Sequence, residues 1–406
     1  MSEQKKQVLY ISYDGMTDFL GQSQVLPYLA GLSKLGYHFH LISFEKPDRF
    51  KKFRGDIQSL CDTHHISWYP LSYTKKPPLL STLYDVWRMQ RLAFKLHQQH
   101  AFSIVHCRSY LAALVGLKLK RRHGVKFVFD MRGFWADERV DGGLWNLANP
   151  IYNTVYNFFK RKENEFFNQA DHIVSLTEEG KKELLSWEKV ARKETDVTVI
   201  PCCVDTNLFN PEAINPDQKR KLKESLNIAN EEFILGYVGS IGTWYMLDEM
   251  LAFFKILLTK NMKAKFLFIT GEDPLVILGK AKELEIPTEK LVVVSSIHKY
   301  VPLHISLFDY SIFFIRPSFS KKASSPTKQG EIMAMGIPLI CNSGVGDTDT
   351  IVKKYNSGIV LEELSDISFQ AVDLHTHSFL PQILREGAIN YFSLTKGVEL
   401  YDEILR

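Results

Sequence analysis

The sequence contains no long hydrophobic run. None of its apolar stretches reaches the roughly 18 residues that a membrane-spanning helix needs. The first residues, MSEQKKQVLYISYDG, are polar and pass directly into a strand-like segment, so we expect no signal peptide. These absences predict a cytoplasmic protein, in which any contact with the inner face of the membrane is peripheral.

The sequence also has few cysteines, few metal-binding patterns and only a small excess of positive over negative charge. Five cysteines are scattered over 406 residues without a Cys-x-x-Cys pair, which argues against a zinc site and favours reduced thiols. The run DTD at 347–349 is only a weak candidate for a magnesium diphosphate site, so we expect no metal or other cofactor. A net charge of +4 is too small to argue for a nucleic-acid partner.

What the sequence does have is a regular alternation of short apolar runs and helical patterns. Helical patterns are expected, for example, at 23–35, 110–122, 246–260 and 325–335. Near-continuous apolar strands between helices are typical of parallel sheets covered on both faces. We therefore expect an α/β fold with two doubly wound, Rossmann-like domains that face a cleft. The expected strands are 7–12, 39–44, 103–107, 126–131, 172–176, 197–201, 233–239, 265–271, 291–296, 310–315, 338–343 and 358–361.

A change in composition predicts where the two domains meet. The segment 209–232 is rich in proline, asparagine and charge, and we interpret it as a linker. The N-terminal domain would then span 1–208 and the C-terminal domain 233–384. The remaining residues, 385–406, are expected to form a closing helix.

Glycine-containing loops follow the first expected strand of each domain. In open parallel sheets, ligands bind outside the carboxyl ends of the strands. Glycine lets the backbone approach a phosphate closely, so Gly21 and Gly239 are candidate phosphate-binding positions. Simple turn geometry is the alternative explanation for both glycines.

The helix expected at 325–335 begins with a cation instead of an acid. Ser325 is the expected N-cap and Pro326 the first helical residue, which places Lys328 in the first turn. The helix dipole disfavours a cation there, unless an anion binds at the same helix end. Further cations precede the helix at Arg316, Lys321 and Lys322. Glu331 lies three residues after Lys328 and therefore shares its helix face.

Five segments of the chain resemble the retaining glycosyltransferases of family 4, which have the GT-B fold. They span nearly the whole chain in the order of that family. The last of them resembles the helix that crosses back to the first domain in the family. The segments are GQSQVLPYLAGLSKLGYHFHLISFE (21–45), NQADHIVSLTEEGKKEL (168–184), VIPCCVDTNLFNP (199–211), GEIMAMGIPLI (330–340) and INYFSLTKGVELYDEI (389–404).

The resemblance implies transfer of a sugar from a nucleotide-diphosphate donor to a glycan or lipid-linked acceptor. It implies retention of anomeric configuration and no metal, with the donor on the C-terminal domain and the acceptor on the N-terminal domain. Glu331 matches the glutamate that holds the nucleotide ribose in the family. The leaving phosphate can itself take the acceptor proton, so no dedicated protein base is required.

Four positions depart from the pattern of the family. The first glutamate of its paired motif falls on Ala323. An arginine and a lysine that clamp the diphosphate fall on Ser240 and Tyr245, and a histidine of the first domain falls on Arg132. The donor phosphates therefore need other cations, for which Lys328 and Arg316 are candidates.

We assign two groups of site residues from these arguments. Ordinary ion pairs on loops and helix surfaces are the alternative explanation for the charged ones. The donor-binding group is Gly21, Gly239, Ser240, Arg316, Ser325, Thr327, Lys328 and Glu331. The catalytic group is Arg132, Asp137 and Glu138.

Two other functions stay open on the sequence alone. A sugar-nucleotide 2-epimerase shares the two-domain architecture, and a non-catalytic partner of a glycan-assembly complex would account for the missing motif residues. The basic stretch 117–126 is interpreted as a solvated helix end, with contact to anionic lipid headgroups as its alternative.

Overall fold

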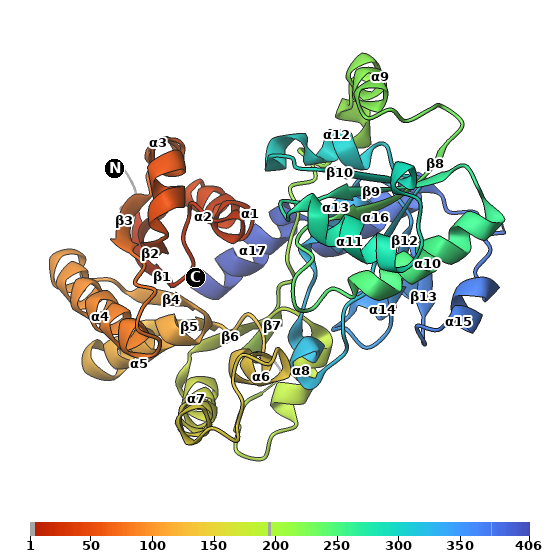
Figure 1. Ribbon diagram of the computed structural model, residues 1–406. Helices are drawn as coiled ribbons and strands as arrows, with labels where there is room; N and C mark the ends of the chain where they lie inside the picture. The colour runs from red at the N-terminus through yellow and green to blue at the C-terminus, as the bar shows by residue number, and fades with distance from the viewer. Residues whose placement is uncertain (1–4, 194–195, 375) are drawn as a thin grey trace. The chain divides into compact units, whose positions relative to one another are not determined.

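The computed structural model of the chain describes residues 5–193, 196–374 and 376–406. These residues form two compact units (Figure 1). The first unit comprises Met1–Pro201, Lys322–Ser324 and Leu394–Arg406, and the second comprises Cys202–Lys321 and Ser325–Ser393. Within the described residues, no helix combines the length and the apolar character that a membrane crossing requires.

The first unit is built on a seven-stranded parallel sheet with the order β3-β2-β1-β4-β5-β6-β7. Its strands are β1 Lys6–Ser12, β2 Tyr37–Glu45, β3 Ser67–Ser72, β4 Ile104–Arg108, β5 Lys126–Asp130, β6 His172–Ser175 and β7 Val197–Val199. Its helices are α1 Phe19–Gln24, α2 Leu26–Ser33, α3 Pro47–Thr63, α4 Leu80–His100, α5 Ser109–His123, α6 Trp135–Asp141, α7 Pro150–Gln169, α8 Glu178–Leu185 and α17 Leu394–Leu405.

The second unit is built on a six-stranded parallel sheet with the order β10-β9-β8-β11-β12-β13. Its strands are β8 Phe233–Val238, β9 Ala264–Ile269, β10 Leu291–Val294, β11 Tyr310–Phe313, β12 Leu339–Asn342 and β13 Gly358–Leu361. Its helices are α9 Pro216–Ser225, α10 Leu247–Lys260, α11 Pro274–Glu283, α12 Val301–Ile305, α13 Thr327–Ala334, α14 Thr348–Lys354, α15 Asp366–Ala371 and α16 Pro381–Phe392. Short 3-10 turns are η2 Pro211–Ala213, η3 Thr288–Lys290, η4 His298–Tyr300 and η5 Phe319–Ala323.

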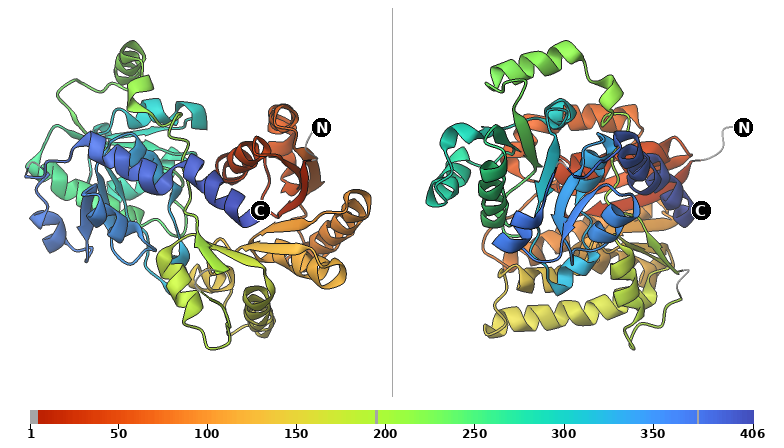
Figure 2. Two further views of the ribbon diagram at one scale, coloured as in Figure 1. Left: turned by 180° about the vertical axis from the view of Figure 1, so that it is seen from behind. Right: turned by 90° about the vertical axis from the view of Figure 1, so that its right-hand side faces the viewer.

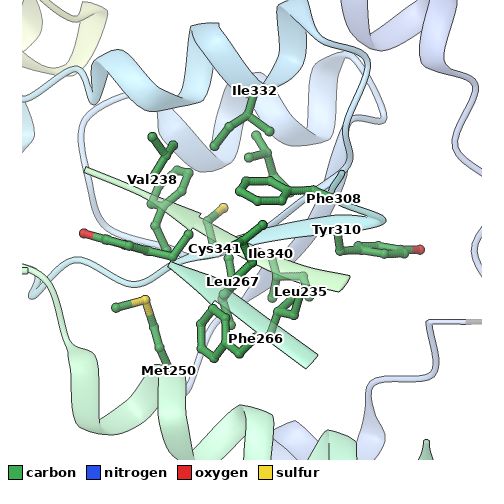
Figure 3. Packing of buried hydrophobic residues seen from close by; sticks show 14 of the residues in the cluster. Leu235, Val238, Met250, Phe266, Leu267, Phe308, Tyr310, Ile332, Ile340 and Cys341 are labelled. Atoms are coloured by element: carbon green, nitrogen blue, oxygen red, sulfur yellow. The ribbon is translucent and has the colours of Figure 1, made fainter. Parts of the chain in front are cut away.

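Both sheets are doubly wound, as the sequence predicts. The strand order reverses between β1 and β4 in the first sheet and between β8 and β11 in the second. Because such crossovers are right-handed, the reversal places helices on both faces of each sheet. In Figure 3, Ile332 of α13 and Met250 of α10 approach the second sheet from opposite faces. The carboxyl ends of the strands beside each reversal are where ligands bind in this architecture.

The expected strands are confirmed, and one further strand escaped the sequence analysis. Strand β3, Ser67–Ser72, contains Pro70 and forms one edge of the first sheet. Proline cannot donate to a ladder of hydrogen bonds and is tolerated at an edge, so the run lacks the pattern of a central strand. All five cysteines are buried.

Two helices that the sequence predicts as continuous are each broken in two. The expected helix 23–35 is interrupted at Val25, just before α2 begins at Leu26 with Pro27 as its second residue. The closing helix is interrupted at Ser393, because the carbonyl of Phe392 accepts a hydrogen bond from the amide of Val204 at 2.7 Å. The segment 209–232, expected as a linker, holds η2 and α9.

The last helix completes the first unit. Helix α17 packs against α2 of that unit (Figure 2). The hydroxyl of Tyr401 on α17 donates to Oδ2 of Asp130 at 2.9 Å, and Nζ of Lys126 donates to the carbonyl of Ile404 at 2.6 Å. A cation at the C-terminal carbonyls of a helix is favourable, so these contacts attach the chain end to the sheet.

Candidate functional site

Helix α13 begins one residue later than the sequence predicts. Ser325 is not the N-cap, since the helix spans Thr327–Ala334 and Pro326 occupies the cap position with an extended ψ of 116°. The hydroxyl of Ser325 instead accepts a hydrogen bond from the amide of Cys202 at 3.2 Å. Lys328 still lies in the first turn, and that turn contains no acidic residue.

The side chain of Lys328 is buried among aromatic groups. Its ammonium donates to the hydroxyl of Tyr237 at 2.8 Å. The same nitrogen lies 3.6 Å from the ring centroid of Tyr245 and 4.0 Å from that of Tyr237. Burial holds the pKa of Lys328 well below its ordinary value, and the charge of Glu331 offsets this only in part.

Tyr245 occupies the position at which the family resemblance places a phosphate-clamping lysine. The chain thus has an aromatic ring where the family has a cation, and this ring contacts the amine of Lys328 from α13. Cation–π attraction stabilises an ammonium without neutralising its charge, whereas a carboxylate would neutralise that charge. The arrangement therefore places one buried amine between two tyrosine rings at the N-terminus of α13.

The loop after β8 fits closely around this lysine. Gly239 has a φ of 116°, and a Cβ at this position would lie 3.0 Å from Nζ of Lys328. The hydroxyl of Tyr237 donates to the carbonyl of Ser240. Gly239 is therefore required both by its backbone conformation and by the approach of the lysine.

Two more of the expected cations lie over Trp244 of the same loop. The guanidinium of Arg316 is 5.1 Å from the Trp244 ring centroid, and Nζ of Lys321 is 3.7 Å from it. The amide of Arg316 donates to the carbonyl of Trp244 at 2.9 Å, which fixes the loop against the end of β11. The loop 239–246 thus arranges three cations on aromatic faces at the point where the strand order reverses.

Glu331 is buried one turn after Lys328 on the same helix. Its Oε1 lies 3.3 Å from Nε2 of His298, which belongs to η4 after β10. Sequence reasoning missed His298, because no local pattern links it to a helix that begins 29 residues later. The loops after β8, β10 and β11 and the start of α13 therefore meet around Lys328 and Glu331.

The expected catalytic residues belong to the first unit. Arg132 follows β5 with a φ of 57°, and its Nη1 lies 3.8 Å from Oδ1 of the buried Asp130. Burial alone would raise the pKa of Asp130, but Arg132, the nearby imidazole of His106 and the charge of Arg108 lower it to about 2. Arg132 thus lies at the carboxyl end of a central strand, beside an ionised carboxylate.

Asp137 lies inside a network of hydrogen bonds. Its two carboxylate oxygens accept hydrogen bonds from Tyr156 and Lys160, each at 2.8 Å. Lys160 also pairs with Glu163 on α7. These contacts attach α6 to α7, and Glu138 follows on α6 with a half-buried side chain. A catalytic role for Asp137 or Glu138 stays a prediction.

Gly21 packs against the loop that follows β1. A Cβ at this position would lie 2.3 Å from the carbonyl oxygen of Gly15. That loop is held by Glu45, whose carboxylate accepts from the amides of Met16 and Thr17 at 2.8 and 3.0 Å. Glu45 was not identified from the sequence, although a buried acid at the end of an apolar strand is a signal for such a role.

The motif position at Ala323 is buried in the first unit. A Cβ at Gly180 would lie 2.8 Å from Cβ of Ala323, and the hydroxyl of Thr177 donates to the carbonyl of Lys322 at 2.6 Å. The segment Lys322–Ser324 is therefore attached to the start of α8. Among the described residues, no group of three or more His, Cys, Asp and Glu side chains is placed to hold a metal ion.

Known proteins and families relate to this chain through both sequence and structure. A family model described as Glycosyltransferase Family 4 matches residues 22–208, and one described as Glycosyl transferases group 1 matches residues 218–371. A search of curated proteins gives no match.

Solved structures of similar fold cover nearly the whole chain. Sucrose-phosphate synthase from Thermosynechococcus elongatus has a TM-score of 0.75 and 16% identity, over 99% of this chain and 98% of that one. Anabaena HepE in complex with UDP and glucose has a TM-score of 0.71 and 14% identity, over 98% and 99%. WaaG, a glycosyltransferase involved in lipopolysaccharide biosynthesis, has a TM-score of 0.67 and 13% identity, also over 98% and 99%.

At these identities the structures show a shared fold, and the family models carry the assignment further. The two models match consecutive parts of the chain and together take in most of it. The two doubly wound parallel sheets agree with the GT-B architecture. This chain therefore belongs to the GT-B glycosyltransferases that are described by family 4 and group 1.

Proposed function

We propose that the second unit binds a nucleotide-diphosphate sugar at the N-terminus of α13. The diphosphate would lie against Lys328, the loop at Gly239 and Ser240, and the first amides of α13 near Thr327. Glu331, one turn later, would accept hydrogen bonds from the ribose hydroxyls. The observation that carries the proposal is the buried amine of Lys328, held by two tyrosine rings at a helix N-terminus.

The chemistry of glycosyl transfer explains why a cation would be kept there. Negative charge grows on the leaving diphosphate as the bond to the sugar breaks. Lys328, Arg316 and the helix amides are suited to stabilise that charge. They would take over the role of the two cations that the family has at the positions of Ser240 and Tyr245. The complex of the similarly folded HepE with UDP and glucose supports a nucleotide-sugar donor of this class.

We further propose that transfer retains configuration, requires no metal and uses a glycan or lipid-linked acceptor on the first unit. The involvement of the similarly folded WaaG in lipopolysaccharide biosynthesis supports an acceptor of that class. Arg132, at the carboxyl end of β5, is suited to bind an anionic group of the acceptor or donor. Activity that persists in excess EDTA would support the metal-free part, and its loss with recovery on adding Mg²⁺ would contradict it.

Calorimetric titration with UDP tests the donor site directly. Because burial lowers the pKa of Lys328, a bound diphosphate should raise that pKa again and cause proton uptake on binding. Titrations in two buffers of different ionisation enthalpy measure this uptake. Lys328→Met should weaken UDP binding and abolish the uptake.

Lys299→Met is the matched control for this titration. Lys299 also lies over a tyrosine ring, at 4.7 Å from the Tyr300 centroid, but its side chain is exposed. The control should bind UDP as the unmodified protein does. Equal binding by both variants would place the phosphate site elsewhere.

A non-catalytic partner is the second candidate, because Ala323 is buried where the family has a glutamate. A glycan-assembly partner without activity would bind neither UDP nor UDP-sugars in the same titration. An epimerase would convert UDP-sugars without an acceptor. Chromatography of UDP-sugar incubations with and without acceptor therefore distinguishes transfer from epimerisation.

A further inference from the structure

Helix α4 of the first unit has two different faces. One face is buried against the unit and consists of Ser81, Asp85, Met89, Ala93 and Leu96. The opposite face presents large apolar side chains at its N-terminal end, where Leu80 is 64%, Leu83 66%, Tyr84 52% and Trp87 53% exposed. Figure 1 shows α4 beside α5 at the periphery of this unit.

The spacing of these four residues places them on one continuous stripe. They stand at positions i, i+3, i+4 and i+7 of the helix, which brings their side chains together. Single exposed apolar residues are common on soluble proteins, whereas contiguous apolar patches mark interaction sites. The stripe therefore needs an explanation that an isolated exposed leucine does not.

The charges around the stripe are almost all positive. Lys75 and Lys76 precede α4 and are exposed, and the guanidiniums of Arg88 and Arg91 lie 5.5 and 5.6 Å from the ring centroids of Tyr84 and Trp87. Asp85 is the one acidic residue in the sequence between 73 and 100. It is buried, and its carboxylate accepts hydrogen bonds from Tyr13 and Thr74 and pairs with Arg88 at 3.4 Å.

We propose that this surface docks on an anionic lipid bilayer. The docking surface is defined as Leu80, Leu83, Tyr84 and Trp87 together with the cations Lys75, Lys76, Arg88 and Arg91. Tryptophan and tyrosine favour the level of the lipid headgroups, where the ring is in an apolar layer and its polar atom reaches water.

The combination of side chains decides between a membrane and other partners. An amphipathic helix with an apolar stripe and flanking cations is the form that lies in the plane of a membrane surface. Basic residues beside such a helix gain attraction from anionic headgroups, which matches the excess of positive charge here. The surface belongs to the first unit, so the inference does not depend on the donor proposed for the second.

Co-sedimentation with vesicles tests the proposal. The full chain should bind vesicles of phosphatidylcholine with 30% phosphatidylglycerol, more weakly at high salt, and should bind pure phosphatidylcholine much less. Leu83→Gln combined with Trp87→Gln should weaken binding roughly tenfold or more, because two large side chains no longer enter the bilayer. Lys75→Glu combined with Lys76→Glu should cause a loss of similar size.

Matched control variants separate this surface from general effects of polarity and charge. Met262→Gln with Ile367→Gln changes two residues that are 80% and 82% exposed elsewhere, and should leave vesicle binding unchanged. Lys51→Glu with Lys52→Glu reverses another exposed pair of lysines, on α3, and should have little effect. Equal losses in the control pairs would overturn the proposal.

Fluorescence quenching by brominated lipids locates the contact. Trp87 should be quenched on vesicle binding, and Trp87→Phe should remove most of that quenching while the protein still binds. The proposal is wrong if the unmodified protein ignores anionic vesicles, or if Leu83→Gln with Trp87→Gln binds them normally. It is also wrong if that double variant abolishes self-association in sedimentation velocity without altering vesicle binding, because the surface would then join two copies.

Discussion

Lys328 is a titratable amine whose charged form is disfavoured by burial, and this makes the stability of the protein depend on its protonation. Burial lowers the pKa of Lys328 in the folded state, whereas in the unfolded chain the pKa of a lysine is about 10.4. Between these two values the unfolded state binds more protons than the folded state. The free energy of unfolding should therefore rise with pH in that window.

Replacement by methionine isolates this effect, because it removes the titrating group and keeps a similar volume. Urea unfolding at pH 7 and pH 9.5 should show that the unmodified protein gains stability relative to Lys328→Met as the pH rises. Other titrating groups are common to both proteins and cancel in the difference. A difference that does not change with pH would mean that the lysine is solvated in the folded state.

Glu331 offers a second test at the scale of a single side chain. Glu331→Gln keeps the size of the residue but loses its charge-assisted acceptance, worth about 1.5–3 kcal/mol. Affinity for UDP should fall about ten- to a hundredfold, with the fold intact by circular dichroism. Glu363→Gln, at an exposed position of the same unit, should have no effect. Normal UDP affinity in Glu331→Gln would show that the carboxylate serves only its contact with His298.

At the scale of elements, the loop 239–246 brings the candidate donor site together. Gly239 starts this loop with a φ of 116°, a conformation that side-chain-bearing residues adopt at a cost of about 1–3 kcal/mol. Gly239→Ala should therefore destabilise the second unit by that amount. It should also weaken UDP binding, since the new methyl group displaces the lysine.

Gly242 in the same loop is the matched control. A Cβ there meets no atom within 4 Å, and Gly242→Ala should change stability little. Thermal unfolding with and without UDP compares the two variants. A loss of equal size in both would assign the effect to loop flexibility, not to the geometry at Gly239.

Most strands and helices could be predicted from the sequence, but the positions at which helices are interrupted could not. Apolar runs flanked by helical patterns gave the central strands, because buried parallel strands have no solvent face to interrupt the pattern. The edge strand with Pro70 and the break at Ser393 depend on partners elsewhere in the chain, such as Val204. The prediction that Ser325 is the N-cap was wrong for the same reason, since its hydroxyl accepts a hydrogen bond from the amide of Cys202.

The candidate site shows the same division. Lys328 and Glu331 could be named as candidates, Lys328 because a cation in the first turn of a helix conflicts with a local rule, and Glu331 because it shares that helix face and matches the family motif. Tyr237, Tyr245 and His298 could not be assigned as their partners, because those contacts join separate strands and loops of the second unit. The role of Glu45 could not be predicted for the same reason, since its hydrogen bonds join β2 to the loop after β1.

At the scale of the whole molecule, each unit has its own hydrophobic core, and each contains a tyrosine–aspartate hydrogen bond that a Tyr→Phe replacement can remove. In the first unit the Tyr401 hydroxyl donates to Asp130 at 2.9 Å, and in the second the Tyr391 hydroxyl donates to Asp347 at 2.8 Å. A hydrogen bond to a charged acceptor contributes about 1.5–3 kcal/mol. Domains with separate cores often unfold in separate steps, so we expect the two bonds to act on different transitions.

Scanning calorimetry of Tyr401→Phe and Tyr391→Phe tests this independence together with the donor proposal. Tyr391→Phe should lower the transition of the second unit, and Tyr401→Phe should lower that of the first. Because a ligand stabilises the unit that binds it, UDP should raise the transition that Tyr391→Phe lowers and leave the other unchanged. If UDP instead raises the transition that Tyr401→Phe lowers, the nucleotide binds the first unit. A single transition that both variants lower would show that the units unfold together.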